Sequence, residues 1–188
     1  MKTALLASYE KDAALLRLGN LLKDAGWQIF GSAGTAKYLN EHGVPCRDVG
    51  EMIGPPILGH RVVTLSRRIY AALLSTPDDS PEMDRLLIRP FDLVYVTLYP
   101  LEATIADPNT KPKDVIEKTD IGGPTLLRAA AKGRRIVLHS REQVEEFERR
   151  LKNGMFDDDK YRIALAAAAE RRVADYVAAS ATYWENRL

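Results

Sequence analysis

The run FDLVYVTLY at positions 91–99 constrains the fold of this 188-residue chain more than any other segment. It is apolar almost throughout instead of at every second position, and such strands are buried on both faces in parallel sheets covered by helices. Three shorter strands are expected over 3–8, 27–32 and 45–49, with helices over 11–25 and about 35–41 between them. This alternation predicts an α/β chain, a three-layer αβα fold with a mainly parallel open sheet.

The second half of the chain is expected to be mostly helical. The periodicity predicts helices over 61–75 and 141–152, a surface turn over 76–81 and a last strand over 134–139. An Ala-rich helical region follows over 157–186. Its apolar face needs cover from the domain or from a partner subunit, and consists of Ile163, Ala167, Val173, Tyr176, Val177 and Ala181. We therefore expect one domain over 1–188, with the sheet core at about 1–140 and C-terminal helices at about 141–188.

The overall composition argues against several classes of function. A net charge of +1 with 46% hydrophobic and 28% charged residues is typical of a soluble globular protein and gives no reason to expect nucleic acid as a partner. The lack of a signal-like N-terminus and of an apolar run of about 18 residues indicates a cytoplasmic protein without a membrane segment. The single cysteine, Cys46, follows Pro45 in an expected strand, which favours a buried, inert thiol. The three histidines, His42, His60 and His139, show no metal-ligand spacing, so no metal site is expected.

Two polar segments fall at the ends of expected strands, where open parallel sheets bind ligands. The turn GSAGT at 31–35 opens a helix, and its hydroxyls, free N–H groups and helix dipole suit a phosphate. A plain strand–turn–helix connection explains the same residues about equally well. Tyr99, at the end of the most apolar strand, is either a core aromatic with a solvated hydroxyl or a site residue.

A third segment, DIGGPTLLRAAAK at 120–132, combines an acid, two glycines and the start of a helix. Pro124 suits the first turn of a helix, and Gly122 and Gly123 let the backbone approach a ligand closely. Free N–H groups beside this turn are a candidate site for an anion or a developing oxyanion. Lys132, at the far end, is either a solvated helix-end cation or a second catalytic charge. The residues alone leave open whether the segment is only an ordinary capped helix.

In this order and at these separations, the segments resemble the cyclohydrolase domain of the bifunctional purine-biosynthesis enzyme that makes inosine monophosphate (IMP). The resemblance runs from about 4 to 184 and rests on the stretches ALLASYEKDAALLRLGNLL, IFGSAGTAKYLNEHGVP, PPILGHRV, FDLVYVTLYPLEATIADP and DIGGPTLLRAAAKG. The last stretch is the most specific. The resemblance implies a methylglyoxal-synthase-like fold. The transformylase domain that normally follows is absent from this sequence, which implies that a separate enzyme transfers the formyl group.

The resemblance also implies a reaction. In the family, the carboxamide nitrogen of 5-formamidoimidazole-4-carboxamide ribonucleotide (FAICAR) attacks its own formyl carbon and water leaves, without a metal or organic cofactor. By resemblance, Asp120 polarises or deprotonates the amide nitrogen. Lys132 and Tyr99 act on the formyl oxygen or the departing water. The N–H groups around Gly122 and Gly123 hold the developing negative charge.

Substrate binding is implied for residues spread along the chain. The 5′-phosphate is expected on hydroxyl and glycine residues of the 31–35 turn, with positive charge from a lysine and an arginine. The full set of expected substrate contacts, besides the two glycines at 122 and 123, is Lys11, Ser32, Gly34, Thr35, Arg61, Thr64 and Thr97. From the residues alone, the lysine and the arginine are equally explained as exposed surface cations. The resembled family dimerises, so a homodimer that binds a small-molecule nucleotide is expected.

The sequence departs from the family pattern where the substrate is expected. The family usually has Lys-Thr-Leu-His-Pro where this chain reads VTLSR, so Val63 replaces a lysine and Ser66 a histidine. Thr97 stands in place of an asparagine that can read a base edge. Three interpretations follow: a free-standing IMP cyclohydrolase, which we prefer, an enzyme of the same reaction type on a related nucleotide in a specialised pathway, and a nucleotide-binding homologue without catalysis. Methylglyoxal synthase is disfavoured because the Gly-Gly-Asp segment of that family is missing.

Overall fold

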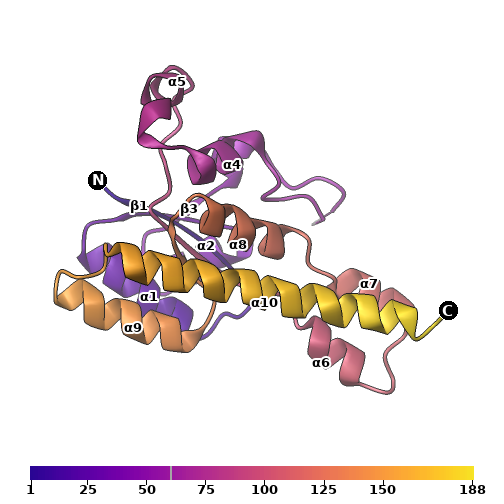
Figure 1. Ribbon diagram of the computed structural model, residues 1–188. Coiled ribbons are helices and arrows are strands. Elements are labelled where there is room, and N and C mark those ends of the chain that lie inside the picture. The colour runs from indigo at the N-terminus through magenta and orange to yellow at the C-terminus, as the bar shows by residue number, and fades with distance from the viewer. Residues whose placement is uncertain (60) are drawn as a thin grey trace.

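Five parallel strands form the centre of the molecule in a computed structural model of the chain (Figure 1). The structure describes residues 1–59 and 61–188. The strands are β1 (Thr3–Ser8), β2 (Gln28–Gly31), β3 (Arg47–Asp48), β4 (Leu93–Thr97) and β5 (Ile136–Leu138). Their order in the sheet is β3-β2-β1-β4-β5, and every pairing is parallel. The predicted α/β fold with a parallel open sheet is confirmed.

Helices connect the strands and cover the sheet. The described α-helices are α1 (Ala13–Asp24), α2 (Ala33–Glu41), α3 (Gly50–Ile53), α4 (Arg67–Leu74), α5 (Ser80–Arg85), α6 (Leu101–Ala106), α7 (Pro112–Lys118), α8 (Gly122–Lys132), α9 (Arg141–Lys152) and α10 (Asp159–Glu185), with one 3-10 turn at Pro77–Asp79. The expected strand over 3–8 and helix over 141–152 have these same bounds in the structure. Helix α1 starts after Asp12, whose side chain accepts a hydrogen bond from Leu15 N at 2.9 Å and so satisfies one free helix N–H.

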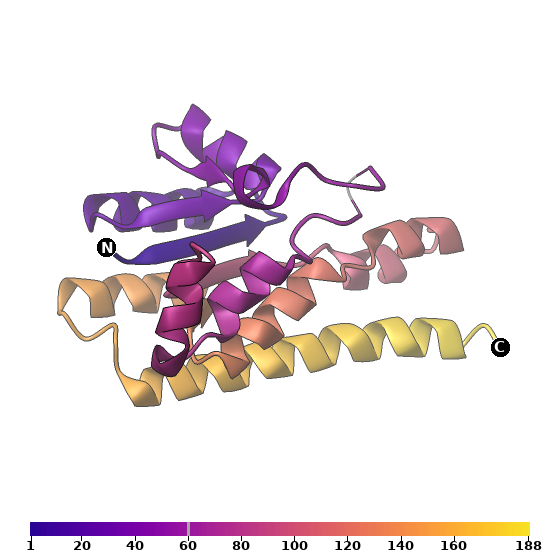
Figure 2. The same cartoon turned by 90° about the horizontal axis from the view of Figure 1, so that it is seen from above.

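The apolar run at 91–99 lies where its pattern predicts. Its strand β4 sits between β1 and β5, and Leu93, Val94, Tyr95 and Val96 are each at most 1% exposed. Helix α8 packs on β4 and β5, and α10 in turn packs on α8 and β5. Figure 2 shows α10 running along one side of the molecule to the C-terminus, with α6 and α7 grouped near its far end.

The long C-terminal helix is covered on one side only. The predicted region over 157–186 forms the single helix α10. Two members of its expected apolar face, Val173 and Tyr176, are buried against the domain, but Ile163 and Val177 are 47% and 54% exposed. The domain therefore provides cover for part of that face and leaves the rest at the surface.

The helix expected over 61–75 is much shorter in the structure. Helix α4 begins only at Arg67, because the side chain of Ser66 accepts a hydrogen bond from Arg68 N at 3.3 Å and caps the helix there. Upstream, Ile57 and Val62 form an isolated antiparallel bridge, and residues 61–66 before the helix are irregular. Apolar spacing alone did not distinguish this irregular segment from the helix that follows it. His60 lies outside the described residues.

Candidate functional site

A cavity of about 630 Å³ opens at the carboxyl ends of the central strands. Ser8 and Thr97 end β1 and β4 and are paired in register, so both strands terminate at the cavity wall. The N-terminal ends of α2 and α8 also face it. It is lined by most of the residues expected from sequence to form the site, namely Lys11, Ser32, Gly34, Arg61, Thr64, Thr97, Tyr99, Asp120, Gly122 and Gly123.

One end of the cavity is formed by the start of α2. The Ser32 side chain does not cap this helix, and its hydroxyl instead donates to Thr35 Oγ1 at 3.0 Å. The backbone at Ala33 and Gly34 lines the cavity, so the positive end of the helix dipole is directed at it. The ammonium of Lys11 lies beside Gly34, because a Cβ added to that glycine would lie 4.0 Å from Lys11 Nζ. These groups place positive charge at this end of the cavity.

Thr35 stabilises this end of the cavity without lining it. It is fully buried and does not line the cavity. Its hydroxyl accepts a hydrogen bond from Ser8 N at 3.1 Å and therefore ties α2 to the end of β1. The structure thus corrects the expectation that Thr35 contacts the phosphate directly. The hydroxyl is used in a backbone contact that fixes the turn.

The carboxylate of Asp120 is the central polar group at the other end of the cavity. Its Oδ1 accepts a hydrogen bond from Gly123 N at 2.8 Å, and backbone N–H groups of Tyr99 and Gly122 also donate to the carboxylate. Burial raises the pKa of Asp120 above its ordinary value, and the three backbone donors oppose this rise. The carboxylate is therefore fixed in direction and is a stronger base than an exposed aspartate.

Gly123 provides both the space for the Asp120 carboxylate and one of the hydrogen bonds that hold it. A Cβ added at Gly123 would lie 2.5 Å from Asp120 Oδ2 and 2.6 Å from Leu98 Cδ2, so only glycine allows the carboxylate to lie there. The Gly123 N–H that was expected to hold a developing negative charge is occupied by the Asp120 carboxylate. This corrects the expected oxyanion role of that N–H group.

The position of Asp120 is further fixed by a residue of α10. The Tyr176 hydroxyl accepts a hydrogen bond from Asp120 N at 2.8 Å and donates one to Lys118 O at 3.0 Å. Burial raises the pKa of Tyr176 to about 12, so the hydroxyl keeps its proton at neutral pH. The segment 118–120 is therefore clamped at both ends by one buried hydroxyl.

Two tyrosines form an aromatic wall beside Asp120. The rings of Tyr9 and Tyr99 lie 5.1 Å apart between centroids and are tilted by 55°. Burial, mainly, and the nearby Asp120 charge raise the pKa of Tyr99, and the charge of Lys118 partly lowers it. The Tyr99 phenol is therefore neutral at physiological pH and can donate a hydrogen bond into the cavity.

The walls near the expected ring-binding region are less polar than the family pattern implies. Val63 and Leu126 line this part of the cavity, and the side chain of Val63 offers neither charge nor donor. The Thr97 hydroxyl lines the cavity but is already used, because it pairs with Ser8 Oγ at 2.7 Å and accepts from Glu10 N at 3.0 Å. The Thr97 hydroxyl can therefore contact a substrate, as expected from the sequence, only through the hydrogen-bonding capacity that these two contacts leave.

The rim of the cavity carries an ion pair. Arg61, an expected phosphate ligand, lies 2.9 Å from Glu117 Oε1, and both side chains are largely exposed. Thr64 lies close to the start of α8, since a Cβ added at Gly122 would be 3.0 Å from its Oγ1. Arg61 can therefore meet a phosphate only by sharing or leaving its carboxylate partner.

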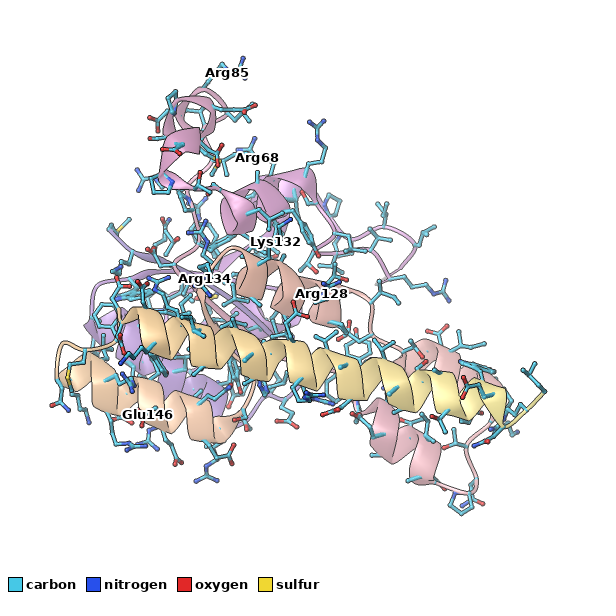
Figure 3. The ribbon with its side chains drawn as sticks, viewed as in Figure 1. Arg68, Arg85, Arg128, Lys132, Arg134 and Glu146 are labelled. Carbon is cyan, nitrogen blue, oxygen red and sulfur yellow. The ribbon has the colours of Figure 1, made fainter. Side chains whose placement is uncertain are left out.

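Lys132 does not reach the cavity in this chain. It occupies the last turn of α8, is exposed, and lies one turn beyond Arg128 along the same helix (Figure 3). Because a helix rises 1.5 Å per residue, about 15 Å of helix separates it from Gly122. This corrects the expectation that Asp120 and Lys132 act together: the helix that joins them in sequence also holds them apart.

Tyr9, which lines the cavity, was not predicted from the sequence as a site residue, and neither were Lys118 and Tyr176, which contact residues that line it. Tyr9 lies in the loop after β1 and carries no motif of its own, and Tyr176 was expected on an apolar face without a polar role. Lys118 directly precedes the segment 119–120 and carries no motif of its own. Its nearness to Tyr99 results from the turn between α7 and α8.

Comparison with known proteins identifies the family. Residues 14–125 match the family described as "MGS-like domain". The chain belongs to the family of MGS-like domains. It is 37% identical over 185 residues to the bifunctional purine biosynthesis protein PurH of Natranaerobius thermophilus, and 41% identical over 187 residues to PurH of Synechococcus elongatus. These alignments cover 97% and 96% of this chain but only 36% of each relative, so the chain spans about a third of their length.

A solved structure extends the likeness to the whole MGS-like chain. The crystal structure of ForH matches with a TM-score of 0.82 and 29% sequence identity, and the match covers 97% of this chain and 98% of that one. The C-terminal helices are therefore part of the shared architecture, although they lie outside residues 14–125. The expected methylglyoxal-synthase-like fold and its resemblance to the purine-biosynthesis enzyme are confirmed.

Other expectations concern groups outside the cavity. Burial, with a contribution from the Asp48 charge, raises the pKa of Cys46 to about 12, which agrees with the expected inert thiol. Among residues 1–59 and 61–188, no set of three or more metal-ligating side chains is placed to hold an ion. Within the same ranges, no helix combines the length and apolar character needed to cross a membrane.

Proposed function

We propose that this MGS-like domain closes the pyrimidine ring of FAICAR to form IMP, as a cyclohydrolase. The observation that carries the proposal is the partly buried Asp120 carboxylate, which faces the cavity beside Tyr99 with its direction fixed by backbone donors. The PurH-like sequence supports the choice of substrate. In this proposal the formyl group is already on the substrate when it arrives, so its transfer belongs to another domain or a separate enzyme upstream.

Asp120 acts on the nucleophile. An amide nitrogen is a poor nucleophile, and the reaction is intramolecular, so the protein contributes mainly proton transfer and charge stabilisation. Burial raises the pKa of Asp120, which makes the ionised carboxylate a stronger base for the carboxamide proton. As that proton leaves, the nitrogen forms its new bond to the formyl carbon.

Tyr99 acts on the leaving oxygen. The formyl oxygen must gain two protons before it departs as water. One comes in effect from the carboxamide nitrogen and the other from the formamido nitrogen, so no external proton is consumed. The neutral phenol of Tyr99 lies across the same end of the cavity as Asp120 and hydrogen-bonds the oxygen as charge develops on it.

The 5′-phosphate is placed at the start of α2. Ser32, Gly34 and Lys11 line that end, and the helix dipole and the lysine supply positive charge without a metal. Burial lowers the pKa of Lys11 from its ordinary value, as is common for a cation held in a partly closed pocket. A bound phosphate dianion would offset that effect.

A related nucleotide is the second candidate substrate. Val63 makes one wall apolar, and the Thr97 hydroxyl is committed to Ser8 and Glu10. A nucleotide whose ring carries different hydrogen-bonding groups along its edge from those of FAICAR would fit such a wall. The likeness to ForH, which matches this chain almost from end to end, shows that the same architecture is found outside the PurH relatives described above.

The two candidates are separated by turnover and binding. Purified protein is mixed with FAICAR, and IMP formation is followed by its ultraviolet absorbance. The proposal predicts turnover above the uncatalysed rate. Tight binding of IMP without turnover would support a nucleotide-binding homologue without catalysis, and weak binding of both IMP and FAICAR would favour the related-nucleotide substrate.

A further inference from the structure

Lys118, at the end of α7, is the cation closest to the aromatic wall among the interactions of the described residues. Its Nζ lies 5.3 Å from the centroid of the Tyr9 ring and 5.9 Å from that of Tyr99, and it is 3.5 Å from the Tyr9 hydroxyl. Distances of about 6 Å or less to a ring centroid allow a cation–π attraction. One ammonium therefore lies within cation–π range of both tyrosines of the wall.

The backbone of Lys118 is held more firmly than that of an ordinary surface lysine. Its carbonyl oxygen accepts the Tyr176 hydroxyl at 3.0 Å, and the same hydroxyl accepts from Asp120 N at 2.8 Å. The lysine and the carboxylate are thus two residues apart on one clamped turn, with Tyr99 beside both. Their spacing is set by a buried contact from α10 and not by the exposed side chains.

The charges around Tyr99 show in which direction Lys118 shifts the pKa of that phenol. The titratable groups that face this phenol are Asp120, Lys118 and Tyr9. Burial has the largest effect and raises the pKa of Tyr99, and Asp120 and Tyr9 raise it further, whereas Lys118 lowers it. Without the lysine, every remaining influence would make the phenol a poorer proton donor. The opposite wall at Val63 supplies no compensating charge.

We propose that Lys118 is a positioning residue of the site, which holds the rings of Tyr9 and Tyr99 together and directs positive charge at the Tyr99 phenol. The inference rests on the proposed function for its role in turnover, since the lysine acts on the leaving oxygen through Tyr99. Under this proposal, the positive charge at this end of the cavity comes from Lys118 on α7 and not from the segment that contains Val63.

The turnover test compares three variants with FAICAR as substrate. Lys118→Met should lower kcat by about tenfold while KM changes less than about twofold, because the phosphate end of the cavity is untouched. Lys118→Arg should recover most of the rate, since a guanidinium also stacks on aromatic rings. Lys113→Met is the matched control, because Lys113 is exposed on the same helix. Equal kcat for Lys118→Met and Lys113→Met would overturn the inference.

A second measurement does not depend on turnover. Alkaline titration of phenolate absorbance, in the wild type and in Tyr99→Phe, gives the Tyr99 contribution by difference. Lys118→Met should move that contribution to higher pH, and Lys113→Met should leave it in place. No movement would overturn the inference even if FAICAR is converted. If FAICAR is not converted but the titration moves, the proposed function fails and the coupling of Lys118 to Tyr99 stands.

Discussion

At the scale of single residues, the site depends on how closely backbone N–H groups and the Asp120 carboxylate approach each other. Asp120 is held by backbone donors at Tyr99, Gly122 and Gly123, and Leu98 closes the same space from the sheet side. Such packing leaves no volume for a side chain at Gly123. The position of the acid thus explains why a glycine stands at 123, three residues after Asp120.

Gly123→Ala tests this crowding. The added Cβ would lie 2.5 Å from Asp120 Oδ2 and 2.6 Å from Leu98 Cδ2, so both neighbours must shift. We expect a loss of about 1–3 kcal/mol in the free energy of unfolding, as for other overpacked sites, measured by urea denaturation. Gly34→Ala is the control, because its Cβ would make an ordinary contact at 3.7 Å from Lys11 Cε. Equal stability of the two variants would show that the site can relax around Gly123.

At the scale of elements, the site is assembled from segments distant in sequence. The strand ends of β1 and β4 could be predicted to meet, because apolar runs indicated a parallel sheet and parallel strands end at the same edge. The contact between Tyr176 and Asp120 could not, since the residues are 56 positions apart and the tyrosine lies on a helix with a regular apolar face. The irregular segment before Ser66 was predicted to be helical because its apolar spacing also fits a helix.

Tyr176→Phe tests the contribution of α10 to the site. The change leaves Asp120 N and Lys118 O without their buried partner, and such losses cost about 1–3 kcal/mol in the free energy of unfolding. We also expect lower turnover of FAICAR, because the turn that carries Asp120 is released. Tyr161→Phe on the same helix is a matched control, since the structure gives its buried hydroxyl no hydrogen-bond partner among the described residues. Equal melting temperatures for the two variants would contradict this role.

At the scale of the whole molecule, helix α10 contacts the site through Tyr176 and leaves part of its apolar face at the surface. One side of α10 packs on α8 and β5, and the uncovered part of its apolar face presents Ile163, Val177 and Trp184, of which Val177 is 54% exposed. The sequence predicted that this helix needs cover, and the domain supplies it for only part of the apolar face. The sequence resemblance placed Asp120 and Lys132 in one site, but the length of α8 keeps Lys132 out of the cavity.

The homodimer expected from the resemblance stays a prediction. Light scattering at micromolar concentration should give twice the monomer mass, because the exposed apolar side of α10 favours association with a second copy. Val177→Glu should shift the population toward monomer by placing a charge on that face. A wild-type monomer under these conditions would contradict the predicted dimer.

The central claim is that the Asp120 carboxylate drives ring closure in this cavity, and one comparison tests it most directly. Initial rates of IMP formation from FAICAR are measured for the wild type and for Asp120→Asn, with melting temperatures recorded at neutral pH. The melting temperatures check that the variant is folded in the assay, because the Asn side chain has nearly the shape of the carboxylate and keeps one acceptor oxygen for Gly123 N. The account predicts turnover by the wild type and a loss of about 10² or more in the folded variant. Equal rates for the two proteins, or no wild-type rate above the uncatalysed reaction, would contradict it.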